Sequence, residues 1–123
     1  MNILYEEGNT NIFRDKRGKI VNITPELKIK DILYITGVTG AIRGNHYHKT
    51  DFHYCYVTQG EIQYEWESVD GKGSVKLKAG DMVFSPAGEK HRFIFLSDGA
   101  FISLAKNDRS TENYEEDTCR EEF

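Results

Sequence analysis

The chain has 123 residues, of which 29% are charged and 38% hydrophobic, and its formal net charge is −4. This length suits one domain with one continuous core, and no apolar stretch approaches the roughly 20 residues that a membrane-spanning helix needs. The first residues lack the basic and apolar regions of a secretory signal, so we expect a cytoplasmic protein. Two distant cysteines, Cys55 and Cys119, predict no disulfide framework.

Negative charge is concentrated at the carboxyl end of the chain. Residues 107–123 hold seven acids and two arginines, a net charge of −5, so the remainder is close to neutral. A nucleic-acid-binding protein presents a basic face, and this distribution argues against that function. We interpret the tail as a solvated segment packed weakly on the domain, in which Glu112–Glu122 could form a short helix.

Short runs rich in Ile, Val, Tyr and Phe alternate with Gly, Asp and Asn, and helical periodicity is almost absent. Turn signals lie at Asp15–Gly18, Asp70–Gly73 and Lys78–Asp81. Many short strands at this spacing predict an all-β sandwich or barrel. In chain order the runs are Ile12–Arg14, Lys19–Ile23, Lys30–Thr36, Phe52–Thr58, Glu61–Ser68, Ser74–Lys78, Asp81–Phe84, His91–Leu96 and Ala100–Ala105.

The histidines have the spacing of metal ligands. His46 and His48 are separated by one residue, so on a strand both imidazoles point to one face. His53 follows five residues later, and His91 opens a later strand. Three neighbouring imidazoles and a fourth from a partner strand make a donor set for a divalent transition metal inside a barrel.

The glycines around these histidines complete the pattern of a known family. Gly40 is followed, after five residues, by the pair His46 and His48. Four residues later comes His53, and after six more comes Gly60. This spacing resembles the first motif of the cupin superfamily. The one departure is His53, where the family usually has Glu. The second motif is matched by Gly80, Pro86, Gly88 and His91, with Phe95 in place of the usual Asn.

The resemblance implies one cupin domain over residues 1–123, a double-stranded β-helix or jelly-roll barrel with a short acidic tail. Its motifs lie at about 40–60 and 80–95. Gly60 and Gly80 are expected at positions of positive φ. The implied metal ligands are His46, His48, His53 and His91, and the metal could be Zn, Ni, Fe or Mn. Four neutral imidazoles leave the double charge of such a metal uncompensated.

A narrower resemblance involves the segment Arg43-Gly44-Asn45-His46-Tyr47-His48-Lys49. It is similar to the Arg-Gly-x-His-x-His-Lys segment of cupins that act on nucleotide-linked deoxysugars, which include the dTDP-sugar 3,4-ketoisomerases. The Asp15–Gly18 turn resembles their early Asp-x-Arg-Gly turn. The resemblance implies a keto-sugar substrate attached to a nucleotide. In the ketoisomerases the His-x-His pair is catalytic, whereas the general cupin pattern makes it a metal ligand.

The predicted chemistry is proton abstraction next to a carbonyl group, through an enediolate. A metal on the histidines could stabilise the enediolate, and without a metal His48 or His46 would be the general base, with Tyr47 between them. Arg43 and Lys49 are candidates for diphosphate contact, although strand alternation turns Arg43 away from His46 unless the chain bends at Gly44. Aromatic surfaces for a sugar or base could come from Tyr54 and Trp66, or these could pack the core.

Two other functions fit the same residues. One is a non-haem metal dioxygenase, because imidazole-rich sites leave metal positions open for O₂. The other is a cupin that binds or senses a small molecule without a reaction. The runs that precede the first motif, including Leu4-Tyr5 and Ile32–Ile35, exceed the needs of one small barrel. We therefore expect a homodimer whose N-terminal strands pack against the partner or are exchanged with it.

Overall fold

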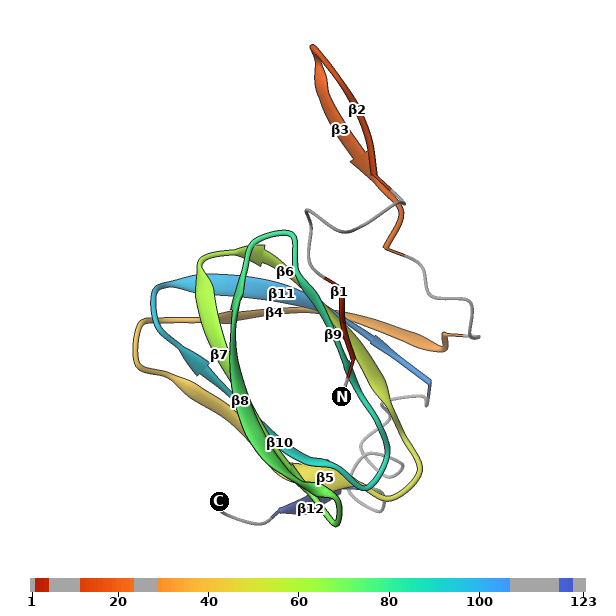
Figure 1. The fold of residues 1–123 in the computed structure, drawn as a ribbon, viewed down its shortest axis with the longest axis vertical. Coiled ribbons are helices and arrows are strands. Elements are labelled where there is room, and N and C mark those ends of the chain that lie inside the picture. Colours follow the sequence, from red (N-terminus) through yellow and green to blue (C-terminus); the bar gives the residue numbers. More distant parts are fainter. Residues whose placement is uncertain (1, 5–11, 24–28, 107–117, 121–123) are drawn as a thin grey trace.

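The computed structural model describes residues 2–4, 12–23, 29–106 and 118–120, and strands account for most of them (Figure 1). No helix in this part of the chain is long and apolar enough to cross a bilayer. The strands are β1 (Asn2–Leu4), β2 (Ile12–Asp15), β3 (Gly18–Val21), β4 (Asp31–Gly37), β5 (Ile42–His48), β6 (His53–Gln59), β7 (Glu61–Ser68), β8 (Gly71–Lys78), β9 (Met82–Ser85), β10 (Lys90–Phe95), β11 (Gly99–Ala105) and β12 (Thr118–Arg120).

Two five-stranded antiparallel sheets form the walls of a barrel (Figure 1). One sheet has the strand order β1-β9-β6-β11-β4, and the other has the order β12-β5-β10-β7-β8. Strands adjacent in space are often distant in sequence, as where β11 lies between β4 and β6. This arrangement confirms the predicted all-β jelly-roll fold.

The core lies between the two sheets because alternate residues of each strand point inward. On β6, Cys55 and Val57 are buried, while Tyr54 and Tyr56 between them are only half-buried. The strands of the opposite sheet contribute further large apolar side chains, each worth about 1.5–3 kcal/mol when fully buried. The buried cluster consists of Cys55, Val57, Ile62, Tyr64, Leu77, Val83, Phe93, Phe95 and Phe101.

The hairpin of β2 and β3 stands away from the barrel (Figure 1). Its turn is held by the carboxylate of Asp15, which accepts hydrogen bonds from the backbone N–H of Arg17 at 2.8 Å and from its Nη2 at 2.6 Å. The guanidinium bonds, followed by the backbone bond, lower the pKa of Asp15. Phe13 and Ile20 pair across the hairpin and are 58% and 69% exposed.

Several local predictions can be compared with this fold. Gly60 and Gly80 have φ values of 80° and 98°, as expected, and Cys55 and Cys119 are not joined by a disulfide. The predicted turn at Asp70–Gly73 is wrong by two residues, because Ser68 pairs with Gly71 and the later glycines belong to β8. Within the predicted tail helix Glu112–Glu122, residues 118–120 form strand β12 instead, and the others lie outside the described residues.

Candidate functional site

A cavity of about 300 Å³ opens between the two sheets. Its wall has a polar part, which carries all four histidines, and an apolar part, which carries aliphatic and aromatic side chains from both sheets. Few cations or acids line it. The lining residues are Leu33, Ile35, Arg43, Gly44, His46, His48, His53, Cys55, His91, Phe93, Phe101 and Ser103.

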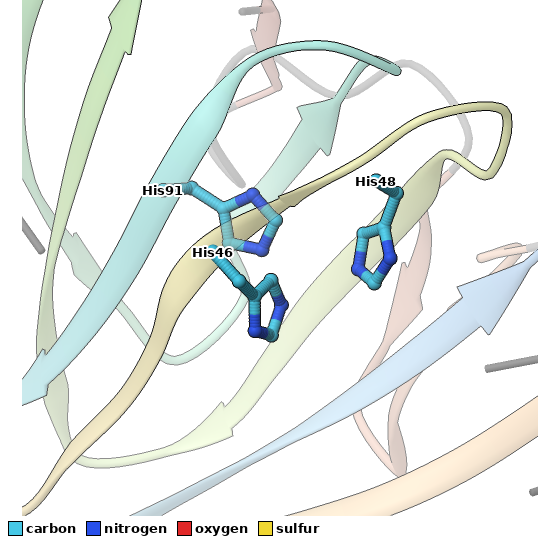
Figure 2. A group of neighbouring side chains, drawn as sticks. All are labelled: His46, His48 and His91. Atoms are coloured by element: carbon cyan, nitrogen blue, oxygen red, sulfur yellow. The ribbon is translucent and has the colours of Figure 1, made fainter. Parts of the chain in front are cut away.

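Three of the histidines face one another across two adjacent strands (Figure 2). His46 and His48 lie two residues apart on β5, and His91 of β10 pairs with His46 in the sheet register. The ring centroids are 4.7 Å apart for His46 and His48, and 4.9 Å for His46 and His91. His48 and His91 are separated by 5.8 Å. The sheet register therefore places His91, from the second motif, beside His46 and His48, from the first.

A β-bulge on β5 changes the direction of Arg43. The register passes from His91 opposite His46 to Arg92 opposite Gly44, so Asn45 is an extra residue on β5. Gly44 and Asn45 have φ values of 101° and 60°. One extra residue reverses the alternation, so Arg43 lines the same cavity as His46. This is the bend at Gly44 on which the placement of Arg43 depended.

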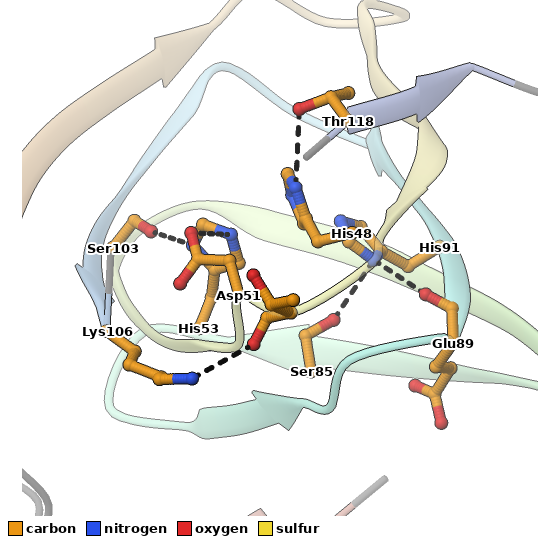
Figure 3. Close-up of polar contacts among 10 residues, drawn as sticks. His48, Asp51, His53, Ser85, Glu89, His91, Ser103, Lys106 and Thr118 are labelled. Atoms are coloured by element: carbon orange, nitrogen blue, oxygen red, sulfur yellow. Dashed lines mark hydrogen bonds and ion pairs between the residues drawn. The ribbon is translucent and has the colours of Figure 1, made fainter. Parts of the chain in front are cut away.

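The ring of His91 is held by a buried polar network (Figure 3). Its Nδ1 lies 3.2 Å from the carbonyl oxygen of Glu89 and 3.1 Å from Oγ of Ser85. A carbonyl oxygen only accepts, so we assign the proton to Nδ1, which leaves the Nε2 lone pair for the cavity. Ser85 also bonds the hydroxyl of Tyr64 at 2.5 Å, and that hydroxyl donates to the Glu89 carboxylate at 2.9 Å.

Burial sets the protonation of this network. Desolvation, and then the proximity of His46 and His48, lower the pKa of His91 from 6.5 to about 3. The imidazole is therefore neutral near pH 7. Desolvation, and next the charge of Glu89, raise the pKa of the Tyr64 hydroxyl, which stays protonated and donates.

His53 lies on β6 and is oriented from both sides of its ring (Figure 3). Its Nδ1 is 3.1 Å from Oγ of Ser103, and its Nε2 is 3.4 Å from Oδ2 of Asp51. Its ring centroid lies 4.6 Å from that of His48 but 6.5 Å from that of His91. Asp51 is only 3% exposed. Asp51 was not among the residues predicted for the site, although its place between the candidate ligands His48 and His53 was a signal that the sequence offered.

The acidic tail contributes to the site as well. Strand β12 pairs with β5, so that Thr118 lies opposite His48. Oγ1 of Thr118 is 3.3 Å from Nδ1 of His48, and both residues are buried. These three residues of the tail are thus part of the sheet rather than a solvated extension. No sequence signal identifies this contact, because it depends on a strand pairing across 70 residues.

The four histidines divide into two overlapping groups of possible metal ligands. His46, His48 and His91 form the first, here called the histidine triad, and His48, Asp51 and His53 form the second, here called the buried triad. Within each group the ligand atoms lie within 4.8 Å of one another. Nitrogen donors with one carboxylate suit the divalent first-row metals, so the residues present fit the metal that the motif implies.

Four of the predicted site residues lie elsewhere. The lining of the cavity includes neither Lys49, Tyr47, Tyr54 nor Trp66. Tyr54 alternates with His53 on β6 and packs against Phe84, with 4.8 Å between ring centroids. Trp66 packs on the apolar core. Lys49 is exposed just beyond the end of β5.

A model of the family described as "Cupin domain" matches residues 35–105 of the chain, which is more than half of it. The chain belongs to the cupin family. The match spans both motifs and all four histidines of the cavity. A search of curated proteins finds no match to this cupin.

Solved structures resemble this cupin over nearly its whole length. A 3,4-ketoisomerase from Helicobacter canadensis has a TM-score of 0.82 at 19% identity, covering 98% of this chain and 90% of that one. The sugar 3,4-ketoisomerase QdtA from Thermoanaerobacterium thermosaccharolyticum, in complex with TDP, has a TM-score of 0.80 at 18% identity, covering 97% and 86%.

A dTDP-4-dehydrorhamnose 3,5-epimerase from Sulfolobus tokodaii is also similar, with a TM-score of 0.72 at 20% identity and coverage of 91% and 80%. At such identities these likenesses show the fold that the chain shares with TDP-sugar ketoisomerases and epimerases.

Proposed function

We propose that this cupin isomerises or epimerises a keto-sugar linked to a nucleotide. The observation that carries the proposal is the cavity itself, in which several imidazoles converge beside one cation and opposite an apolar wall. Imidazoles exchange protons near neutral pH, which is what enolisation next to a carbonyl requires. The fold shared with TDP-sugar ketoisomerases and epimerases supports the same substrate class.

Proton transfer is assigned to His46, with His48 beside it. His46 is half-buried and lines the cavity, whereas His48, His53 and His91 are each at most 4% exposed. Neutral His46 takes the proton from the carbon next to the carbonyl, which leaves an enediolate, and the resulting imidazolium returns a proton to carbon. Return to the neighbouring carbon, with the hydroxyl proton of the enediolate passing to the former carbonyl oxygen, gives the isomer. The epimer forms when water supplies the proton from the opposite face of the same carbon, and the imidazolium then loses its own proton to solvent.

We also propose a divalent metal in this cavity, held by the histidine triad or the buried triad, both of which contain His48. When bound, it would supply a Lewis acid that polarises the substrate carbonyl. The hydroxyls of Thr118 and Ser103 contact Nδ1 of His48 and of His53 and orient both rings, and Nε2 of each ring would be the metal ligand. Elemental analysis of untagged protein tests this part and should find close to one Zn, Ni, Fe or Mn per chain.

The test of the reaction is incubation with a TDP-linked 4-keto sugar in D₂O, followed by proton NMR. An enediolate route predicts loss of a sugar C–H signal and appearance of a new isomer or epimer. His46→Gln should abolish the exchange while the folded fraction stays unchanged. Binding without exchange would favour the small-molecule sensor, and oxygen consumption in place of exchange would favour the dioxygenase.

Arg43 is proposed to contact the diphosphate of the nucleotide. The bulge points it into the cavity, and its Nε donates to the carbonyl oxygen of Thr36 at 2.9 Å, which leaves the Nη groups for an anion. Arg43→Ala should weaken nucleotide-sugar binding by about 2 kcal/mol, the order of one charge-assisted contact. Calorimetry measures it, with Lys72→Ala on β8 as an exposed control. Unchanged affinity in Arg43→Ala would remove this residue from the site.

The remaining proposal is a homodimer in which N-terminal strands pack against the partner or are exchanged with it. Of the run Ile32–Ile35, Leu33 and Ile35 line the cavity, but Ile32 and Tyr34 are 67% and 65% exposed. With Phe13 and Ile20 of the projecting hairpin, they leave apolar surface on strands that a second copy could cover.

A further inference from the structure

We infer that the metal of this cupin is bound by the buried triad, with Asp51 as its anionic ligand. The inference rests on the metal-binding part of the proposed function and names the residues that hold the ion. It also leaves the ring of His46 available for proton transfer.

The separation of Asp51 and His53 is the first observation. Nε2 of His53 and Oδ2 of Asp51 lie 3.4 Å apart. An N–H···O hydrogen bond usually spans about 2.7–3.2 Å, so this contact is long for one. Two ligands that each bind a tetrahedral metal at about 2.0–2.2 Å are roughly 3.4 Å from each other. The two atoms therefore already have the spacing of ligands on one ion.

Orientation is the second observation. Nδ1 of His53 contacts the hydroxyl of Ser103, and Nδ1 of His48 contacts that of Thr118. A hydroxyl can accept from Nδ1–H, and in that tautomer Nε2 of each ring would be the metal ligand. The residues flanking Asp51 are tied to the end of β11: Lys106 donates from its backbone N–H to the carbonyl of Phe52 at 3.2 Å and from Nζ to that of Thr50 at 3.4 Å. The Nδ1 contacts are of the kind that orient the imidazole ligands of metals, and the Lys106 bonds hold the loop that carries Asp51.

Charge is the third observation. A divalent ion on neutral imidazoles alone keeps its full double charge, and a buried charge is costly unless a counter-charge accompanies it. The apolar wall of the cavity, which includes Phe93 and Phe101, would increase that cost. In the buried triad the carboxylate of Asp51 is a ligand and cancels one charge. It compensates for the Glu that His53 replaces in the first motif.

The test is titration of chelator-stripped protein with Zn²⁺ and Co²⁺. We expect Asp51→Asn and His53→Gln each to weaken Zn²⁺ binding more than about 100-fold, which exceeds the 10–100-fold loss typical of removing an outer contact. His46→Gln, the matched change in the histidine triad, should stay within about threefold. A smaller loss in Asp51→Asn, or an equal loss in His46→Gln, would overturn the inference. Circular dichroism in chelator confirms that each variant is folded.

A gain of signal provides a second readout that does not depend on affinity. In Asp51→Cys, a thiolate at position 51 should give the Co²⁺ complex a sulfur-to-metal charge-transfer band in the near ultraviolet that the wild type lacks. Absence of that band in a variant that still binds Co²⁺ would also overturn the inference. Wild-type protein without metal affinity would refute both this inference and the metal part of the proposed function. Deuterium exchange into the keto-sugar would then still test the isomerase separately.

Discussion

Burial and hydrogen bonding fix both the tautomer and the orientation of the His91 ring. Its Nδ1 faces the carbonyl oxygen of Glu89, and the hydroxyls of Ser85 and Tyr64 link that nitrogen to the Glu89 carboxylate. Each of these groups is buried, and each has at least one partner in the network. The imidazole therefore has one tautomer and one orientation before any ligand arrives.

The depressed pKa of His91 predicts a pH dependence of stability in the metal-free protein. Since its pKa falls from 6.5 to about 3 on folding, the unfolded chain binds more protons between these values. The contribution of His91 to the free energy of unfolding is therefore complete above about pH 6.5 and is lost as the pH falls toward 3. Urea titrations in the presence of a chelator measure the free energy of unfolding. Between about pH 3 and 6.5 this free energy should depend less on pH in His91→Gln than in the wild type. NMR titration of the His91 ring near pH 6.5 would contradict the argument.

At the scale of elements, the bulge on β5 determines which side chains share the cavity. A Cβ at Gly44 would come within 2.9 Å of the carbonyl oxygen of His91 and 3.1 Å of Cα of Arg92, and its φ of 101° disfavours any other residue. The bulge therefore depends on glycine at this position, and Arg43 depends on the bulge.

Gly44→Ala should lower the free energy of unfolding by more than Gly40→Ala does. Gly40 also has a positive φ, 87°, but a Cβ there meets open space, so that variant measures the backbone strain of about 1–2 kcal/mol alone. Gly44→Ala adds a clash with the backbone of β10. Chemical denaturation of both variants measures the difference, and nucleotide-sugar binding should fall only in Gly44→Ala. Equal stability of the two variants would show that β10 moves aside without cost.

Sequence reasoning predicted the elements better than it predicted their contacts. Alternating apolar residues and positive-φ glycines are local signals, and they located most of the strands. The spacing of His46 and His48 and the two cupin motifs predicted that these residues converge with His91. The extra residue at Asn45 and the pairing of Thr118 with His48 depend on register between distant strands. A one-residue change in register moves a side chain to the other face, so local pattern alone could not assign them.

At the scale of the whole molecule, apolar side chains pack the interior of the barrel, but others are exposed on its outer surface. Ile32, Tyr34 and Val38 line the outer face of β4 and the turn after it, with exposed fractions of 67%, 65% and 70%. In the sheet, β4 pairs with β11 at the end of the strand order, so one of its edges has no neighbour among the described strands. Exposed edges and contiguous apolar surface are where β proteins associate.

The proposed homodimer predicts a mass in solution of twice the 14.2 kDa of one chain. Light scattering at micromolar concentration measures it. Tyr34→Lys should shift the protein toward monomer, because it places a charge at the centre of the outer face of β4. Val69→Lys is the matched control, since Val69 lies alone in the β7–β8 turn and is 102% exposed. A monomeric wild type would refute the dimer, and loss of the dimer in both variants would place the interface elsewhere than on β4.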